Sequence, residues 1–508
     1  MDLRNDARRS WWRLPGELAR WLDSLPSLAW LGFLTGTAAA ARLSWWLLVA
    51  KRVPIFDEVG YLGNARRLAD GLGYVDATGA PTAFWPPGFP FLVSLVFRAG
   101  GDLGATIGVQ VGLGVLLALI VTRLATADFG RPAGRLAGLA CGLYPNLAMF
   151  STLFLAETLF TLLLAAAALC AIAPPSGRER LGAVLCGGLL AGAVLTRPVA
   201  ILFPLLLPLV YLRRHRALRP AAVASALTLG AFLVALAPWL VRNHAHFGTW
   251  SPSTTGAYNF WIGNHPEALG GYAHGPLPHK NEIERGSSIG FTLGWQSVRE
   301  HPVRAVARSI AKLSYFFALE TDGVLSNLKG LSASPPLSWA LPLLAVANLA
   351  YVTLVIATSA AVASGGWRTP TGLYLVLLTA DLAAMSVIFI GDPRYHFPLV
   401  PFAIPVAVSW LVDALPRQVE RLRSGDPAAL RGARRFAAVV VAWALLMAAN
   451  LYLKKIEFDR GLPARSPVQD RVRATNLQAY PPRNRASRGG ALYLQIQVGS
   501  IEISQAGS

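Results

Sequence analysis

Long apolar runs separated by short polar, Gly-rich or Pro-rich breaks dominate the hydropathy pattern of this chain. A helix that spans a bilayer needs about 20 mainly apolar residues, and about eleven runs of roughly that length recur here. They cover Leu25–Trp46, Leu103–Leu124, Leu136–Ser151, Phe154–Ala173, Leu181–Thr196, Val199–Leu212, Ala221–Leu240, Leu337–Ala363, Thr371–Ile390, Phe397–Leu411 and Phe436–Leu453. The pattern predicts an all-α polytopic membrane protein with about 11 transmembrane helices.

Arginine is concentrated in alternate breaks between these runs. The basic set comprises Arg4, Arg8, Arg9, Arg13, Arg131, Arg135, Arg178, Arg180, Arg213, Arg214, Arg216, Arg368, Arg417, Arg421, Arg423, Arg434 and Arg435. Positive charge near helix ends is retained in the cytoplasm, so a cytoplasmic N-terminus in the inner (plasma) membrane is predicted. Two long segments, Lys51–Asp102 and Arg242–Pro336, then lie outside with the C-terminal tail.

The runs and breaks divide the chain into four predicted parts. These are a cytoplasmic N-terminal segment (1–24), a transmembrane core (25–411) with outer loops at 51–102 and 242–336, a basic cytoplasmic loop with the last transmembrane helix (412–453), and an extracytoplasmic tail (454–508). Within the outer loops, the pattern predicts a helix at Tyr61–Leu72 and interfacial helices in the apolar run ending at Phe97 and at Val303–Leu319.

Composition and charge narrow the class of protein. Of 508 residues, 54% are hydrophobic and 14% charged, which leaves too little polar surface for a soluble globule of this size. The net charge of +19 would suggest nucleic acid in a soluble protein, but here much of it belongs to loops that face anionic lipid. We therefore expect membrane lipids, and no nucleic acid, among the partners. The cysteines Cys141, Cys170 and Cys186 fall within predicted spans, so no disulfide framework is implied.

Three carboxylates near the outer ends of predicted spans are candidates for functional residues. Asp57 and Glu58 are adjacent, just past the first span, and Glu157 is a lone acid in the fourth span. A carboxylate beside a membrane is unfavourable unless it is solvated, paired or bound to a metal ion. The alternatives are that Asp57 and Glu58 face water or neutralise Arg52 and Arg66, and that Glu157 forms a structural salt bridge or binds a metal ion.

Three arginines near the outer face are not required by the distribution of cytoplasmic charge. They are Arg42, Arg197 and Arg394. A guanidinium group presents a planar fork of donors that suits phosphate oxygens, so these side chains are candidates for a phosphate site. The alternative is that each extends its charged end towards the membrane surface.

The order of several motifs resembles the bacterial branch of the C-type glycosyltransferases, which use polyprenyl-phosphate sugars. That branch resembles dolichyl-phosphate-mannose protein mannosyltransferases and the lipid A aminoarabinose transferase. The motifs are IFDEVGYLGNARRLADG, FWPPGFPFLVSLVFRAGG, LAETLFTLL, LTRPVAILFP, PWLVRNHAHFG, GNHP and GDPRYHFPLVP. The resemblance covers roughly Leu28 to Leu411. These motifs are short, and their order and their placement at the outer ends of the predicted spans make the combination specific.

The resemblance implies an enzyme that moves a hexosyl or pentosyl group from a polyprenyl-phosphate donor to an acceptor on the outer side. Asp57 matches the catalytic Asp of such families, with Glu58 completing the acidic pair. A carboxylate suits the reaction independently, because the attacking acceptor hydroxyl needs a general base. Arg197 and Arg394 match positions that neutralise the departing lipid phosphate, and Arg42 matches less closely.

Other readings remain open at this stage. A secondary transporter or flippase of lipid-linked sugars would also be polytopic. In this sequence, however, the candidate charged residues cluster at the outer ends of the predicted spans rather than in broken helices at mid-membrane. A non-catalytic membrane scaffold is a further alternative. The acceptor is open between protein, polysaccharide and lipid, and no cofactor is implied with certainty, although a divalent metal ion could bridge Asp57 and Glu58.

Overall fold

The computed structural model describes residues 14–272, 282, 287–331 and 337–459, and these contain helices and no β-strand. In chain order the elements are α2 (Leu14–Ser24), α3 (Ser27–Leu48), α4 (Asp57–Ala69), α5 (Gly88–Arg98), α6 (Leu103–Phe129), α7 (Arg131–Leu143), α8 (Pro145–Phe150), α9 (Glu157–Ile172), α10 (Glu179–Thr196), η2 (Pro198–Ala200), η3 (Phe203–Leu206), α11 (Leu207–His215), α12 (Leu218–Phe247), α13 (Thr255–Asn264), α15 (Ile289–Glu300), α16 (Pro302–Phe316), α17 (Asp322–Lys329), α18 (Leu337–Ala363), η4 (Gly366–Arg368), α19 (Pro370–Ile388), η5 (Pro393–Tyr395), η6 (Phe397–Leu399), α20 (Val400–Ser409), η7 (Trp410–Ala414), α21 (Leu415–Arg423) and α22 (Pro427–Asp459).

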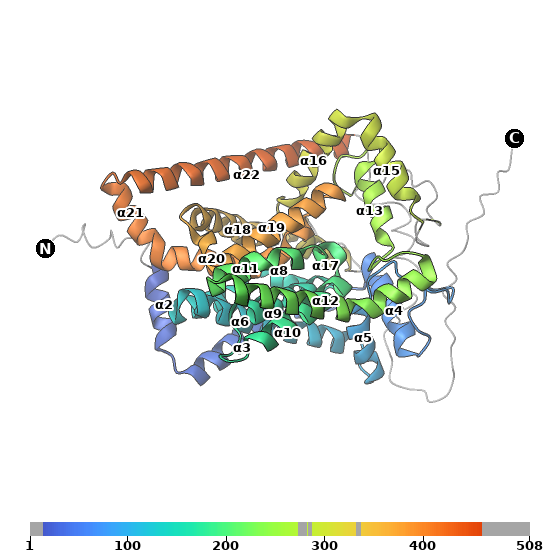
Figure 1. Cartoon of the computed structure of the whole chain (residues 1–508), viewed down its shortest axis with the longest axis horizontal. Coiled ribbons are helices and arrows are strands. Elements are labelled where there is room, and N and C mark those ends of the chain that lie inside the picture. The colour runs from blue at the N-terminus through green and yellow to red at the C-terminus, as the bar shows by residue number, and fades with distance from the viewer. Residues whose placement is uncertain (1–13, 273–281, 283–286, 332–336, 460–508) are drawn as a thin grey trace.

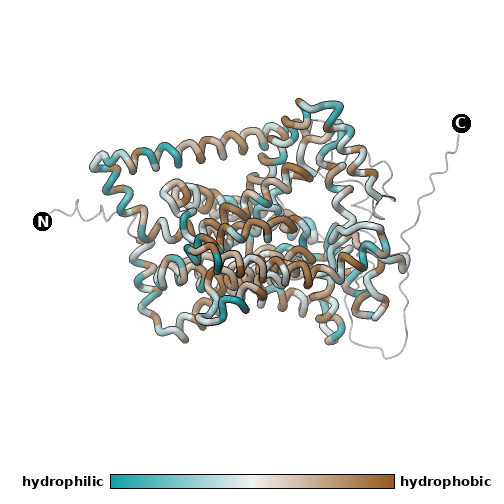
Figure 2. Tube along the Cα trace, in the orientation of Figure 1, coloured by the Kyte–Doolittle hydropathy of each residue, from teal (hydrophilic) through white to brown (hydrophobic). Residues whose placement is uncertain are grey.

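Eight helical segments of the described chain are long and apolar enough to cross a membrane. They are Leu103–Phe129, Glu179–Thr196, Pro198–His215, Leu218–Phe247, Ser338–Ala363, Pro370–Ile388, Pro393–Arg423 and Pro427–Ile456. Each coincides with one predicted span, and Figure 2 shows apolar residues concentrated along these central helices. The chain is an all-α polytopic membrane protein, as predicted, while the count of eleven spans stays a prediction.

The other three predicted spans are helical but differ in form. The first corresponds to α3, a helix of 22 residues. The third is divided at Tyr144, whose extended backbone precedes Pro145, because a residue before proline is disfavoured in the helical conformation. The fourth corresponds to α9, which has only 16 residues and is buried on most sides, as its uniformly apolar sequence requires.

The helices of the two predicted outer loops lie at the same end of the bundle. Figure 1 places α4 and α5 of the first loop and α13 and α15 of the second at one end, and α2 and α21 at the other. Arg242 joins the two loops, because its guanidinium donates hydrogen bonds to the backbone oxygens of Tyr74 (2.9 Å) and Thr82 (3.0 Å). The side of the membrane on which this end lies stays a prediction.

The helices within those loops occur near their predicted positions. The first begins at Asp57 rather than Tyr61, because Asp57 and Glu58 in its first turn favour the positive end of the helix dipole. The apolar run ending at Phe97 forms α5, and the amphipathic stretch forms α16. The basic side of α16 is turned into the protein, where Arg308 and Lys312 are buried. The placement of α5 and α16 at a membrane interface stays a prediction.

The last helix, α22, runs past the end predicted for it. The predicted boundary at Leu453 falls inside α22, which continues to Asp459. It runs along one edge of the molecule in Figure 1 and is almost wholly exposed outside its contacts with α16 and α18. The rest of the predicted tail, 460–508, and the first 13 residues of the N-terminal segment lie outside the described residues.

Candidate active site

Asp57 lies at the first position of α4, at the end of the bundle that holds the outer-loop helices. The preceding residue, Phe56, has a φ of 53°, a conformation that side chains other than glycine rarely adopt. This sharp turn directs the chain from the end of α3 into α4. The side chain of Asp57 is 49% exposed, and its Oδ2 atom lies 3.5 Å from Nη1 of Arg394.

Arg394 belongs to the one-turn helix η5, which follows the end of α19. Asp392 caps this turn, because its Oδ1 atom accepts a hydrogen bond from the backbone N–H of Arg394 at 2.8 Å. The same oxygen lies 3.3 Å from Nε of Arg394. The guanidinium group is therefore held between two carboxylates, Asp392 on its own turn and Asp57 on a distant helix.

Glu157 and Arg197 form a second ion pair beside the first. Glu157 is buried in the first turn of α9, and its Oε1 atom pairs with Nη1 of Arg197 at the end of α10. The guanidinium of Arg197 also lies over the ring of Tyr395, 5.3 Å from its centroid. Since Tyr395 follows Arg394 directly, the structure brings both predicted phosphate-binding arginines to one place. The structure shows Glu157 in a salt bridge, which is one of the alternatives that the sequence left open.

Two cavities meet at the pair formed by Asp57 and Arg394. The larger, of about 310 Å³, and the smaller, of about 270 Å³, are both lined by Asp57, Leu155, Tyr272 and Arg394. Glu157 and Arg197 line the larger cavity but not the smaller one. A carboxylate and a guanidinium group that face two adjoining spaces can act on two molecules at once.

The walls of the two cavities differ in chemistry. Aromatic side chains dominate the larger one, and they are Tyr61, Phe84, Trp85, Tyr258, Tyr272, Phe291, Phe389 and Tyr395. Hydroxyl-bearing and charged side chains line much of the smaller one, including Thr321, Asp322, Ser326, Lys329 and Lys454. The larger cavity suits a ligand with apolar or ring surfaces, and the smaller one suits a polar ligand.

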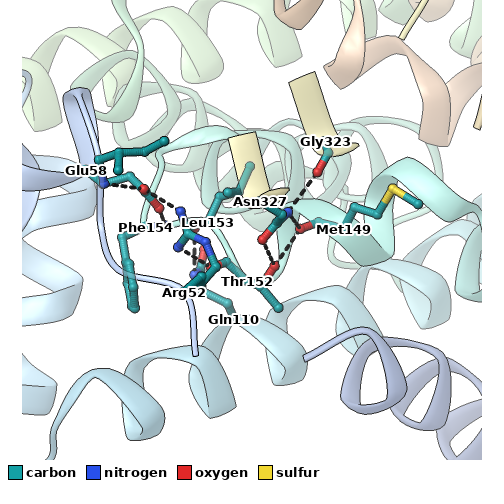
Figure 3. Close-up of polar contacts among 10 residues, drawn as sticks. Arg52, Glu58, Gln110, Met149, Thr152, Leu153, Phe154, Gly323 and Asn327 are labelled. Carbon is teal, nitrogen blue, oxygen red and sulfur yellow. Dashed lines mark hydrogen bonds and ion pairs between the residues drawn. The ribbon is translucent and has the colours of Figure 1, made fainter. Parts of the chain in front are cut away.

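Glu58 lines the smaller cavity beside Asp57 but pairs with other groups. Its side chain is 3% exposed, and Oε2 accepts hydrogen bonds from Nη2 of Arg52 (2.6 Å) and from the N–H of Ile55 (2.8 Å). The other oxygen, Oε1, accepts from the N–H of Phe154 at 2.8 Å. The alternative that Glu58 neutralises Arg52 is thus what the structure shows, and Figure 3 shows this ion pair.

The Arg52–Glu58 pair is part of a larger set of contacts that fixes the connection between α8 and α9 (Figure 3). Arg52 donates to the backbone oxygen of Thr152 (3.0 Å), and Gln110 of α6 donates to that of Leu153 (2.9 Å). Asn327 of α17 accepts from the hydroxyl of Thr152 (2.7 Å) and donates to the backbone oxygen of Met149 (3.0 Å). These contacts position Leu155 and Glu157, which lie directly after them.

Arg42 is not at this site. It is fully buried among α3, α6 and α7, where its Nη1 donates to the backbone oxygens of Ala38 (2.9 Å) and Gly142 (2.8 Å). A Cβ atom on Gly114 of α6 would lie 2.1 Å from Nε of Arg42, so this glycine makes room for it. Arg42 lines neither cavity, and the predicted convergence of three arginines is wrong for this one.

The adjacent carboxylates do not form the metal-bridging pair that the sequence left open. Asp57 faces Arg394 and Glu58 faces Arg52, so each carboxylate is paired with a separate cation. No group of three or more His, Cys, Asp or Glu side chains in the described part of the chain is arranged to hold a metal ion. The residues present therefore do not fit a bridging divalent ion at this pair.

Two residues of the site were not singled out in the sequence. Asp392 precedes Pro393, and an Asp followed by Pro is a common start of a helical turn, so this signal could have been read. Tyr272 belongs to the second outer loop and carries no comparable local signal. Its hydroxyl lies 3.0 Å from that of Tyr258. Only the fold brings it beside Asp57.

Comparisons with known proteins give distant structural similarities. No protein-family model and no curated protein matches the chain. Among solved structures, the archaeal oligosaccharyltransferase AglB from Archaeoglobus fulgidus, in complex with an inhibitory peptide and a dolichol-phosphate, matches with 14% identity over 93% of this chain at a TM-score of 0.45. The chain spans 62% of the length of that protein. ArnT from Cupriavidus metallidurans, bound to undecaprenyl phosphate, matches with 16% identity over 77% of this chain and 79% of its own, at a TM-score of 0.38.

Proposed function

We propose that the protein is a membrane glycosyltransferase that moves a sugar from a polyprenyl-phosphate donor to an acceptor hydroxyl. The observation that carries the proposal is that Asp57 and Arg394 line two adjoining cavities of different chemistry. A transferase of this kind must hold a lipid-linked donor and a polar acceptor on either side of one reacting carbon. The motif resemblance seen in the sequence implies the same reaction.

The larger cavity is assigned to the donor. Arg197 and Arg394 line it and supply cationic donors for the phosphate. The aromatic rings around them offer faces on which a sugar and the first isoprene units can pack. Glu157 lines the same cavity, and its ion pair with Arg197 fixes this guanidinium there while limiting its net charge.

The smaller cavity is assigned to the acceptor, and Asp57 is assigned as the general base. In the reaction the acceptor oxygen forms a bond to the anomeric carbon while the bond from that carbon to the phosphate oxygen breaks. The electron pair leaves with the polyprenyl phosphate, and the hydroxyl proton passes to the Asp57 carboxylate. The phosphate gains a negative charge as the bond breaks, and Arg197 and Arg394 neutralise it.

The contact between Asp57 and Arg394 links the two halves of this reaction. At 3.5 Å it is longer than an ordinary charge-assisted hydrogen bond, and Asp57 is half exposed, so the carboxylate remains accessible to an acceptor. When Asp57 takes the proton, its negative charge disappears, and Arg394 is then attracted more strongly to the phosphate. Proton removal and leaving-group stabilisation thus favour each other.

We place this site on the extracytoplasmic side, because arginine is concentrated in the alternate loops that do not contain it. The acceptor is a hydroxyl compound of the cell envelope, carried by protein, polysaccharide or lipid.

The test is transfer by purified protein in detergent, without any ion gradient, from a synthetic polyprenyl-phosphate sugar. Release of polyprenyl phosphate, with the sugar recovered on an added acceptor or on water, is the expected result. A flippase or secondary transporter would leave the donor intact in detergent and move it only across a sealed bilayer, which would overturn the proposal.

A further inference from the structure

Lys312 is a buried lysine on α16, outside both cavities. Its side chain is among the largest that are fully buried in the described chain. The ammonium nitrogen Nζ donates hydrogen bonds to Oδ1 of Asn264 (2.9 Å) and to the backbone oxygens of Val387 (3.0 Å) and Ile388 (3.3 Å). All three acceptors are uncharged, and none of the ion pairs seen among the described residues balances the lysine.

The two backbone acceptors are the last carbonyl groups of α19. A helix leaves its final carbonyls without partners, and a cation favours the negative end of the helix dipole. Many helices satisfy these groups with a glycine in the left-handed conformation, but here Phe389 follows the helix at φ −97° and ψ −83°. Lys312 therefore supplies from another helix the cap that the chain after Ile388 does not provide. Asn264 assists, because its Nδ2 also donates to the oxygen of Ile388 at 3.0 Å.

The backbone around Lys312 is packed equally closely against the same segment. A Cβ atom on Gly391 would lie 2.2 Å from the backbone oxygen of Lys312, and one on Gly263 would lie 1.7 Å from that of Phe389. The N–H of Gly391 donates to the oxygen of Gly270 at 3.0 Å. The GNHP motif, which includes Gly263 and Asn264, thus holds the stretch that leads directly into Asp392 and Arg394.

Burial, together with the guanidinium of Arg308 one turn earlier, lowers the pKa of Lys312 to about 7. The elements packed against α16 carry further charged or titratable side chains, which include His265 after α13, Arg299 and Glu300 of α15, Asp381 of α19, Asp392 before η5, Arg394 within it, and Lys454 of α22. A neutral amine has two N–H donors for these three acceptors, so deprotonation removes one of the three hydrogen bonds and directs a lone pair at the acceptor that loses it.

We propose that Lys312 is a positioning residue, whose ammonium group ties the end of α19 to Asn264 and thereby places Arg394 against Asp57 and the larger cavity. The inference rests on the proposed function for its effect on transfer, but its structural part stands independently. Lys312 touches neither cavity, so it acts through the segment Phe389–Arg394.

The test compares Lys312→Met, which fills similar space without a charge, with Arg304→Met, a change at an exposed position on the same helix. Hydrogen exchange is measured by mass spectrometry at the amides of Phe389 and Gly391, whose partners are Met385 and Gly270. We expect Lys312→Met to lose protection there and Arg304→Met to keep it. Burial disfavours the charged amine and opening of this segment restores its ordinary pKa, so opening takes up a proton above about pH 7. In the wild-type protein, protection corrected for intrinsic exchange is therefore expected to rise with pH above about 7, and Lys312→Met is expected to lack this rise.

Transfer is measured on the same samples. We expect Lys312→Met to lower kcat by on the order of 10-fold to 100-fold with little change in the KM for the acceptor, because a displaced Arg394 acts mainly on the leaving phosphate. Lys312→Arg, which stays charged, should retain activity above pH 7. Unchanged protection in Lys312→Met overturns the positioning role. Lost protection in a protein that never transfers sugar upholds it and overturns the proposed function instead.

Discussion

Nη1 of Arg394 lies 3.5 Å from Oδ2 of Asp57, and these two side chains, far apart in the sequence, line the same two cavities. Asp57 opens the first helix of the first outer loop, and Arg394 follows the end of α19. In the proposed reaction, Asp57 is the base and Arg394 the cation that stabilises the leaving phosphate. The first two predictions below concern this pair.

Asp57→Asn keeps the size of the side chain and removes the basic oxygen. If proton removal contributes to the rate-limiting step, transfer should fall by roughly 100-fold or more. Binding of polyprenyl phosphate should persist, because Arg197 and Arg394 remain. Rates are measured with a synthetic donor, and binding by quenching of tryptophan fluorescence, since Trp85 lines the donor cavity. Wild-type turnover in this variant would place the base elsewhere.

Arg394→Ala removes a positioned cation from the leaving phosphate, a loss commonly worth about 2 to 4 kcal/mol in the transition state. Arg394→Lys should recover part of the rate, because the charge returns without the planar fork. The same order is expected for Arg197, although its alanine variant also leaves Glu157 unpaired. Arg66→Ala is the matched control, since Arg66 is exposed, lines neither cavity and pairs with Asp70 just after its own helix. Equal rates in Arg394→Ala and Arg66→Ala would contradict the assignment.

Glu58→Gln should act on stability rather than on chemistry. It leaves the buried guanidinium of Arg52 without its carboxylate, and loss of one partner from a buried ion pair commonly costs about 3 to 5 kcal/mol. The expected result is a lower unfolding temperature in detergent, with turnover per folded molecule reduced less than in Asp57→Asn. The double variant Arg52→Gln with Glu58→Gln should recover part of the stability. A stable Glu58→Gln protein without activity would instead give Glu58 a role in the reaction.

Orientation in the membrane is tested in a background without Cys141, Cys170 and Cys186. Thr78→Cys, exposed in the first outer loop, should react with an impermeant thiol reagent in intact cells. Ser176→Cys, exposed in a basic loop predicted to be cytoplasmic, should react only after lysis. The reverse pattern would place the site on the cytoplasmic side.

Local pattern in the sequence was sufficient for most of the helices and for the candidate residues. Runs of apolar residues predicted α10, α18 and α19 to within a few residues, because a bilayer admits little except a helix of nearly fixed length. Charged groups at the ends of such runs were conspicuous for the same reason, and Asp57, Arg197 and Arg394 were found in this way. The break at Tyr144 was missed because hydropathy is continuous across Pro145.

What each charged side chain contacts was decided only by the tertiary structure. Asp57 and Glu58 are adjacent, but successive residues on a helix point about 100° apart, so one pairs with Arg394 and the other with Arg52. Arg42 resembled Arg197 and Arg394 in its position along the chain, yet the space left by Gly114 places it in the core. By itself the sequence determined which segments are helices and which ionisable groups lie at their ends. Their partners depend on distances between segments far apart in the chain, which no local pattern encodes.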